Sequence, residues 1–141
     1  MTTIITDGKE IAADKQTTYG DVKSYTARKK IRKVGGVLYG IGGHLSITPL
    51  LWEWIEAGCT ASEIPCEEGH EWEILRVSKR GVSTLTSDYW RWLASPRVAG
   101  IGTGGSYAEA AMLAGASVKE AVRIASKIDL YSGGGVVTLS L

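Results

Sequence analysis

Several residue types are scarce in this 141-residue sequence, which has no phenylalanine, two cysteines, three prolines and two histidines. Two cysteines outside any metal-ligand spacing provide neither a disulfide framework nor a zinc site. No apolar run is long enough to cross a bilayer, and the first residues, interrupted by Asp7, Lys9 and Glu10, lack the pattern of a signal peptide. The sequence therefore predicts a cytoplasmic protein that contacts no membrane and needs no metal or other cofactor.

An excess of charge of either sign is also missing. Sixteen lysines and arginines against fifteen aspartates and glutamates give a formal net charge of +1, so no whole-molecule field favours nucleic acid as a partner. Apolar residues make up 44% of the chain, which suffices for a buried core without covalent cross-links. The length and this ordinary composition predict one domain spanning residues 1–141.

Glycine, by contrast, is abundant, with 18 residues gathered in short clusters. The clusters lie at 35–36, 40–43, 100–105 and 133–135, next to apolar segments, which indicates tight turns or close backbone approach rather than disorder. Tryptophan takes the place of phenylalanine as the large aromatic residue. We expect most of the five tryptophans to be core or subunit-contact residues: Trp52, Trp54, Trp72, Trp90 and Trp92.

The predicted order of elements is strands, one helix, strands, two helices and a last strand. β-branched residues and apolar alternation predict the strands, and the Asp-Gly pair at 7–8 predicts a hairpin turn between the first two. The predicted strands are 3–6, 9–13, 37–41, 71–78, 82–86, 97–101 and 136–141, and the predicted helices are 50–57, 106–114 and 118–128. Residues 16–21 are interpreted as a polar turn and residues 25–33 as a basic segment. This order predicts an α+β fold with largely antiparallel pairing.

The N-terminus offers a chemistry that needs no histidine. Because Thr2 is small, we expect aminopeptidases to remove Met1, which leaves a hydroxyl and an α-amine in one residue. The reference pKa of an α-amine is about 7.7–8.0, so this amine can act as the general base for its own hydroxyl near neutral pH. A Met-Thr-Thr start is common among proteins, and the prediction therefore depends on the segments that accompany it.

Five segments accompany Thr2. They are A-A-D-K-Q-T-T-Y-G around Asp14, R-K-K-I-R-K-V around Lys30, G-I-G-G-H-L-S at 40–46, G-I-G-T-G-G-S-Y-A-E-A-A at 100–111 and D-L-Y-S-G-G at 129–134. In this order they resemble a proteasome β-subunit and its bacterial ring-peptidase relative HslV, over almost the whole chain. The resemblance implies a four-layer αββα sandwich of the N-terminal nucleophile hydrolases, assembled into rings.

The resemblance also implies catalytic roles. Thr2 becomes the nucleophile and its amine the base, Asp14 matches the aspartate that holds the family's lysine, and Lys30 matches that lysine. A cation beside the nucleophile favours loss of the hydroxyl proton and lowers the pKa of the amine. Asp129 and Ser132 match the D-x-x-S pair that orients the amine.

On the substrate side, the resemblance assigns roles to residues near the glycine clusters. Gly43 matches the glycine whose backbone N–H helps to form the oxyanion hole, where preorganised donors stabilise developing charge. Thr18, four residues after Asp14, falls where the family's backbone pairs with the substrate. Ile41 and Leu45 map near the pocket that receives a substrate side chain.

Two departures from the family pattern leave a second hypothesis open. Thr103 stands where the family usually has serine near the amine, and it keeps a hydroxyl but adds a methyl group. Residues 60–70 leave no room for the family's long second helix, on the side where a ring cap or unfoldase docks, which puts an unfoldase partner in doubt. The sequence thus predicts a threonine peptidase that acts on peptides or unfolded proteins as a ring of identical copies. The alternative is a catalytically inactive ring that serves as a structural or binding module.

Overall fold

The computed structural model describes residues 2–25, 29–60, 64–65 and 69–141, and its elements follow the predicted order. The strands are β1 (Ile4–Thr6), β2 (Glu10–Asp14), β3 (Thr17–Tyr19), β4 (Val22–Ser24), β5 (Ile31–Val34), β6 (Val37–Gly43), β7 (Trp72–Ser78), β8 (Gly81–Thr86), β9 (Tyr89–Ser95), β10 (Ala99–Ile101) and β11 (Val136–Ser140). The helices are α1 (Thr48–Glu56), α2 (Gly105–Leu113) and α3 (Val118–Ile128). None of these helices, within the described residues, is long and apolar enough to cross a membrane.

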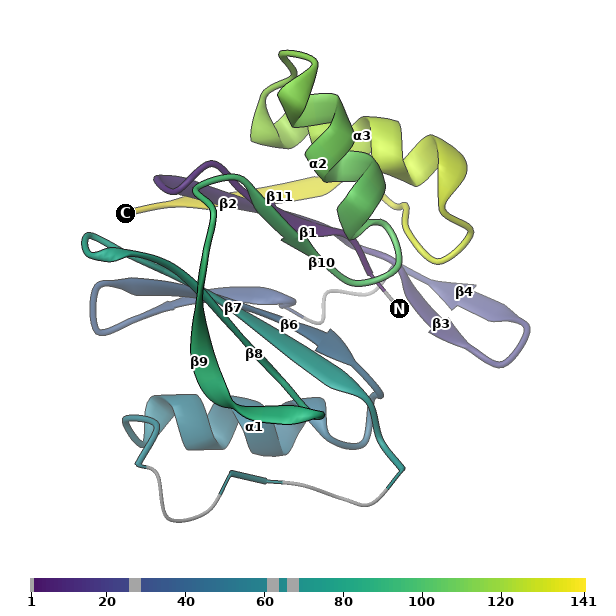
Figure 1. Cartoon of the computed structure of the whole chain (residues 1–141). Helices are drawn as coiled ribbons and strands as arrows, with labels where there is room; N and C mark the ends of the chain where they lie inside the picture. Colours follow the sequence, from purple (N-terminus) through teal and green to yellow (C-terminus); the bar gives the residue numbers. More distant parts are fainter. Residues whose placement is uncertain (1, 26–28, 61–63, 66–68) are drawn as a thin grey trace.

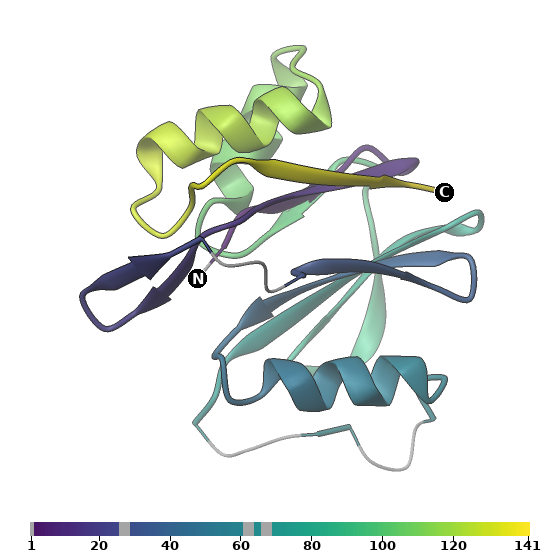
Figure 2. The same cartoon turned by 180° about the vertical axis from the view of Figure 1, so that it is seen from behind.

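Two sheets pack face to face, and helices cover both outer faces (Figure 1, Figure 2). The first sheet has the strand order β10-β1-β2-β11 and carries α2 and α3. The second sheet has the order β5-β6-β7-β8-β9 and carries α1. The strand pairs are antiparallel, and β3 and β4 form a separate hairpin near the N-terminus. The predicted αββα sandwich is confirmed.

Alternation along the strands explains the layers. In β1, Ile4 packs in the core between the sheets, whereas the next residue, Ile5, packs beneath α2 and α3. Successive side chains of a strand point to opposite faces, so a strand that is apolar at both positions belongs in the centre of a sandwich. Both isoleucines are 0% exposed, and burial of each contributes about 1.5–3 kcal/mol. This central strand carries the N-terminal segment into the interior of the fold.

The outer helices agree with the sequence signals that predicted them. Pro49 lies in the first turn of α1, where its missing N–H leaves no hydrogen bond unmade. At the start of α3, the Ser117 side chain accepts a hydrogen bond from the Glu120 N–H at 3.2 Å, which is an N-cap. Between α1 and β7, the described residues contain no helix, in agreement with a sandwich shortened by its second helix.

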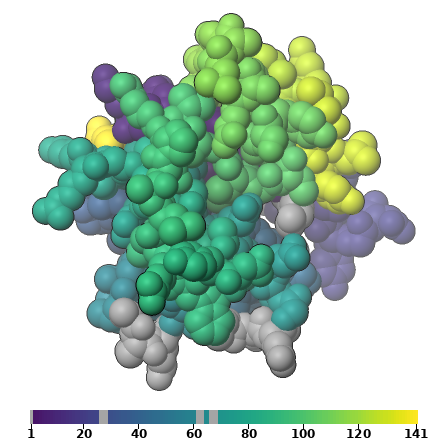
Figure 3. All heavy atoms as spheres, viewed as in Figure 1, coloured from purple at the N-terminus to yellow at the C-terminus, as the bar shows by residue number. Residues whose placement is uncertain are grey.

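Four strands differ from the sequence prediction. The predicted turn at 16–21 contains β3, the basic segment contains β5, and β4 and β9 were not predicted. These strands lie in the hairpin or at the edges of the second sheet, where outward side chains are polar or exposed and apolar alternation is weak. Three of the tryptophans, Trp52, Trp54 and Trp72, are buried as expected. Trp90 on β9 is 58% exposed, and the chain around β9 crosses the front of the molecule (Figure 3).

Candidate active site

Thr2 lies just before β1, in the interior of the fold. The residue is only 3% exposed, and its hydroxyl donates a hydrogen bond to Asp14 Oδ1 at 2.7 Å. Its carbonyl oxygen accepts from the Gly104 N–H at 3.1 Å. Both ends of the residue are therefore fixed, the side chain by β2 and the backbone by the loop between β10 and α2.

Two glycines make room for Thr2. A Cβ on Gly42 would lie 3.0 Å from Thr2 Cγ2, and a Cβ on Gly102 would collide with the Thr2 carbonyl oxygen. Gly102 also has a φ of +82°, a left-handed conformation that favours glycine. The clustered glycines of the sequence thus serve a close approach of two backbones around one threonine.

Asp14 is the acceptor on which the site is built. Its side chain is 0% exposed and lies at the end of β2. Three groups donate to its Oδ1, namely the Thr2 hydroxyl, the Thr3 N–H at 3.0 Å and Lys30 Nζ at 2.7 Å. Two backbone N–H groups donate to its Oδ2, that of Gln16 at 3.1 Å and that of Gly133 at 3.0 Å. A buried carboxylate is tolerated only when it is paired and hydrogen-bonded in this way.

Lys30 supplies the counter-charge. It lies immediately before β5, and its side chain is 11% exposed. Burial is the largest effect on the pKa of Lys30 and lowers it from its ordinary value, while the charges of Asp14 and, more weakly, Asp129 oppose that shift. The ammonium therefore lies beside the Thr2 hydroxyl, because both groups bind the same Asp14 oxygen.

A second network surrounds Asp129, which caps the C-terminus of α3. Its Oδ2 accepts hydrogen bonds from the hydroxyls of Thr103, at 2.7 Å, and Ser132. The Ser132 Oγ is also 2.7 Å from Thr3 Oγ1. The structure thus brings Thr103 together with Asp129 and Ser132, from two segments of the chain, and Ser132 in turn contacts Thr3.

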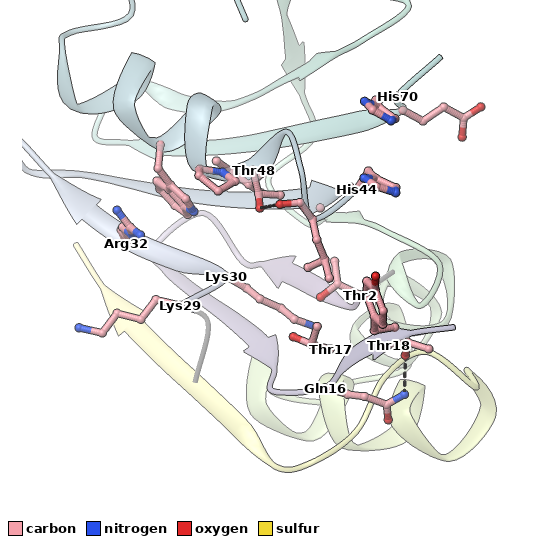
Figure 4. A pocket seen from close by; sticks show the side chains of 18 of the residues that line it. Thr2, Gln16, Thr17, Thr18, Lys29, Lys30, Arg32, His44, Thr48 and His70 are labelled. Carbon is pink, nitrogen blue, oxygen red and sulfur yellow. Dashed lines mark hydrogen bonds between the residues drawn. The ribbon is translucent and has the colours of Figure 1, made fainter. Parts of the chain in front are cut away.

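The Thr2 side chain opens into a pocket of about 920 Å³ (Figure 4). Gly43, Ile41, Leu45 and Thr18, which the resemblance assigns to the oxyanion hole and the substrate, all line this pocket with Thr2. Asp14, Thr103, Asp129 and Ser132 are not among the residues that line it. The arrangement suits attack by the Thr2 hydroxyl on a carbonyl group held in the pocket.

Sequence reasoning missed several residues of the site. Gln16 is 2% exposed and its amide donates to Thr18 Oγ1 and the Leu130 carbonyl, both at 3.0 Å. His44, for which the sequence indicated no role, stacks on His70 with ring centroids 4.5 Å apart at the rim of the pocket. No local pattern connects residues 44 and 70, whereas Gln16 lies only two positions after Asp14, to which its backbone N–H donates. Met1, whose removal the sequence predicts, lies outside the described residues.

The described residues contain no group of three or more histidines, cysteines, aspartates and glutamates placed to hold a metal ion. Asp14 and Asp129 each accept several hydrogen bonds from other groups of the site. The site brings together a buried hydroxyl, a lysine and two carboxylates.

Comparison with known proteins gives structural matches. No protein-family model and no curated protein matches the chain. HslV from Trypanosoma brucei has a similar structure, with a TM-score of 0.77, 22% sequence identity, and coverage of 99% of this chain and 100% of that one. BPH from Thiobacillus denitrificans in complex with epoxomicin has a TM-score of 0.75 and 20% sequence identity, and the match covers 100% of this chain and 98% of that one. A second structure of the same BPH also has a TM-score of 0.75 and 20% identity, with coverage of 99% of this chain and 96% of that one. Identity this low establishes a shared fold, which confirms the fold implied by the resemblance to HslV.

Proposed function

We propose that this chain is a threonine-type peptidase whose nucleophile is Thr2 after removal of Met1. The observation that carries the proposal is the shared oxygen of Asp14, which binds both the Thr2 hydroxyl and the Lys30 ammonium at 2.7 Å. A buried hydroxyl beside a buried cation, at the base of a pocket, is suited to become an alkoxide. The structural likeness to HslV supports the same activity.

The proposed reaction proceeds in two halves. The Thr2 amine takes the hydroxyl proton while the oxygen forms a bond to the carbonyl carbon, and the developing oxyanion turns toward the Gly43 N–H. The amine then gives the proton to the leaving nitrogen as the amide bond breaks, which leaves an ester on Thr2. Water, deprotonated by the same amine, then attacks the ester carbon. The bond to the Thr2 oxygen breaks, the amine returns the proton to that oxygen, and the carboxylic acid product leaves.

Two networks serve the two reacting groups of Thr2, its oxygen and its amine. Lys30 stabilises the negative charge on the Thr2 oxygen, and Asp14 fixes Lys30 in place. The hydroxyls of Thr103 and Ser132, held by Asp129, orient the amine. Peptides and unfolded segments are the proposed substrates, with the backbone near Thr18 and the apolar side chains of Ile41 and Leu45 as their contacts.

Intact mass tests the requirement for a free amine. We expect the protein from its native host to have lost the mass of one methionine, because Thr2 is small enough to permit that cleavage. The processed protein should then react with epoxomicin, whose ketone and epoxide lie on adjacent carbons and suit a residue with a neighbouring hydroxyl and amine. The expected product gains the full mass of the reagent, since neither addition releases an atom. Quantitative retention of Met1 would contradict the proposed function and favour the inactive ring.

We further propose that identical copies assemble into a ring. The exposed apolar side chains of the α2–α3 layer, among them Leu113, 80% exposed, and Leu130, 74% exposed, suit a subunit contact. α1 alone covers the opposite outer face in the described part of the chain, so an unfoldase cap is not part of the proposal. Multi-angle light scattering at micromolar concentration should give a multiple of 15.1 kDa, and a purely monomeric protein would contradict this assembly.

A further inference from the structure

Glu73 is a charged residue in an apolar row of β7. Its strand neighbours Trp72 and Ile74 pack toward α1, whereas Leu75 and Val77 are buried between the two sheets. Because strand side chains alternate, Glu73 shares the inter-sheet face with Leu75 and Val77. A carboxylate on such a face is costly unless it finds a donor, so its partner identifies what it stabilises.

That partner is the backbone of the opposite sheet. Glu73 Oε2 accepts a hydrogen bond from the Gly102 N–H at 2.8 Å. Gly102 directly follows β10 and precedes Thr103. A hydrogen bond to an ionised acceptor is stronger than one between neutral groups, so Glu73 ties the segment 102–104 to the second sheet.

The segment 102–104 is attached to the site at two more points. The Gly104 N–H donates to the Thr2 carbonyl at 3.1 Å, and the Thr103 hydroxyl donates to Asp129 at 2.7 Å. Across the β6–β7 ladder, Glu73 is the register partner of Gly42, the glycine that makes room for Thr2. Glu73 therefore connects the strand end that carries Gly43 with the loop that carries Thr103.

We infer that Glu73 is a positioning residue, which holds Thr103 and the Thr2 backbone in register with Gly43. The inference rests on the proposed function, since it assigns Glu73 to the alignment of that site. Nothing in the sequence indicated it, because the two residues that it links are 29 positions apart. Displacement of reacting groups by about 1 Å can cost on the order of 10²-fold in rate.

Three variants separate positioning from packing. Glu73→Leu removes the acceptor and keeps an apolar row with Leu75 and Val77, while Glu73→Gln keeps an oxygen that can accept from Gly102. Glu109→Leu is the matched control, because Glu109 Oε1 accepts from the Gly100 N–H at 2.7 Å in the same manner, on the α2 side. Each protein is measured with a fluorogenic peptide for kcat and KM, and by hydrogen exchange at the Gly102 amide.

We expect Glu73→Leu to lower kcat by about 10- to 100-fold with KM changed less than about threefold. Exchange at the Gly102 amide should accelerate at least about tenfold. Glu73→Gln should recover most of kcat and of the protection, and Glu109→Leu should keep both. Wild-type kcat in Glu73→Leu, or an equal loss of kcat in Glu109→Leu, would overturn the inference.

Failure of the proposed function gives a different result. In that case the wild-type protein neither cleaves peptides nor reacts with epoxomicin, whereas the exchange measurement is independent of turnover. Unchanged Gly102 protection in Glu73→Leu would then overturn the anchoring by Glu73 on its own, and lost protection would support it.

Discussion

Replacing Thr2 by alanine is expected to abolish hydrolysis of fluorogenic peptides and reaction with epoxomicin. The substitution removes the oxygen that forms the acyl intermediate, and no other described hydroxyl shares the Asp14 oxygen with Lys30. Loss of a nucleophile from such a site lowers kcat by about 10⁴-fold or more. Alanine is also small, so removal of Met1 should proceed in the variant, and intact mass checks this. Turnover equal to that of the wild-type protein would contradict the proposal that the chain is a threonine peptidase.

Two substitutions on the same segment serve as controls for Thr2→Ala. Thr2→Ser keeps both the hydroxyl and the amine and should retain measurable turnover. Thr6, at the far end of β1, is also a fully buried threonine, and within the described part of the chain its hydroxyl bonds only the turn at Gly8 and Glu10. Thr6→Ala should therefore lower stability by about 1 kcal/mol and leave kcat unchanged. A loss of turnover in Thr6→Ala as large as in Thr2→Ala would show that damage to the fold explains both.

Much of the fold and of the candidate site could be predicted, because the local pattern of apolar residues and glycines agrees with the structure that these residues form. Ile4 and Ile5 are apolar at both positions of a strand, and both faces of β1 are indeed buried. The glycine clusters predicted close backbone approach, and Gly102 does lie against the Thr2 backbone. The resemblance to HslV added the pairing of Asp14 with Lys30, which composition and spacing alone do not give.

What the sequence could not supply is the register between distant segments. Glu73 contacts Gly102 because β7 and β10 lie in different sheets that pack against each other. No sequence pattern in either segment predicts how the two sheets pack. The same holds for the stack of His44 on His70. β5 escaped prediction for another reason, since its charged residues Arg32 and Lys33 stand at a sheet edge and hide the alternation that begins at the buried Ile31.

Replacing Lys30 by methionine should lower kcat by about 10²–10⁴-fold, the usual contribution of a group that assists proton transfer. Methionine keeps the length of the side chain and removes its charge. The Thr2 oxygen then loses the cation that stabilises it, while the Asp14 oxygen still accepts from the Thr2 hydroxyl and the Thr3 N–H. Lys33→Met is the matched control, because Lys33 lies three residues further along the chain, on β5, and among the described residues its exposed ammonium donates to the Ser140 carbonyl alone. The control should keep wild-type kcat.

The stability of Lys30→Met decides whether the lysine is merely structural. The variant leaves the Asp14 carboxylate buried without its counter-charge, a change that costs about 3–5 kcal/mol in comparable buried pairs. A second substitution, Asp14→Asn in the same chain, removes the uncompensated charge, and denaturant titration should show that much of the lost stability returns. Turnover should stay low in the double variant, because the cation beside Thr2 is still missing. If kcat recovered together with stability, Lys30 would serve the fold alone, and activation of Thr2 would have to come from its amine without the lysine.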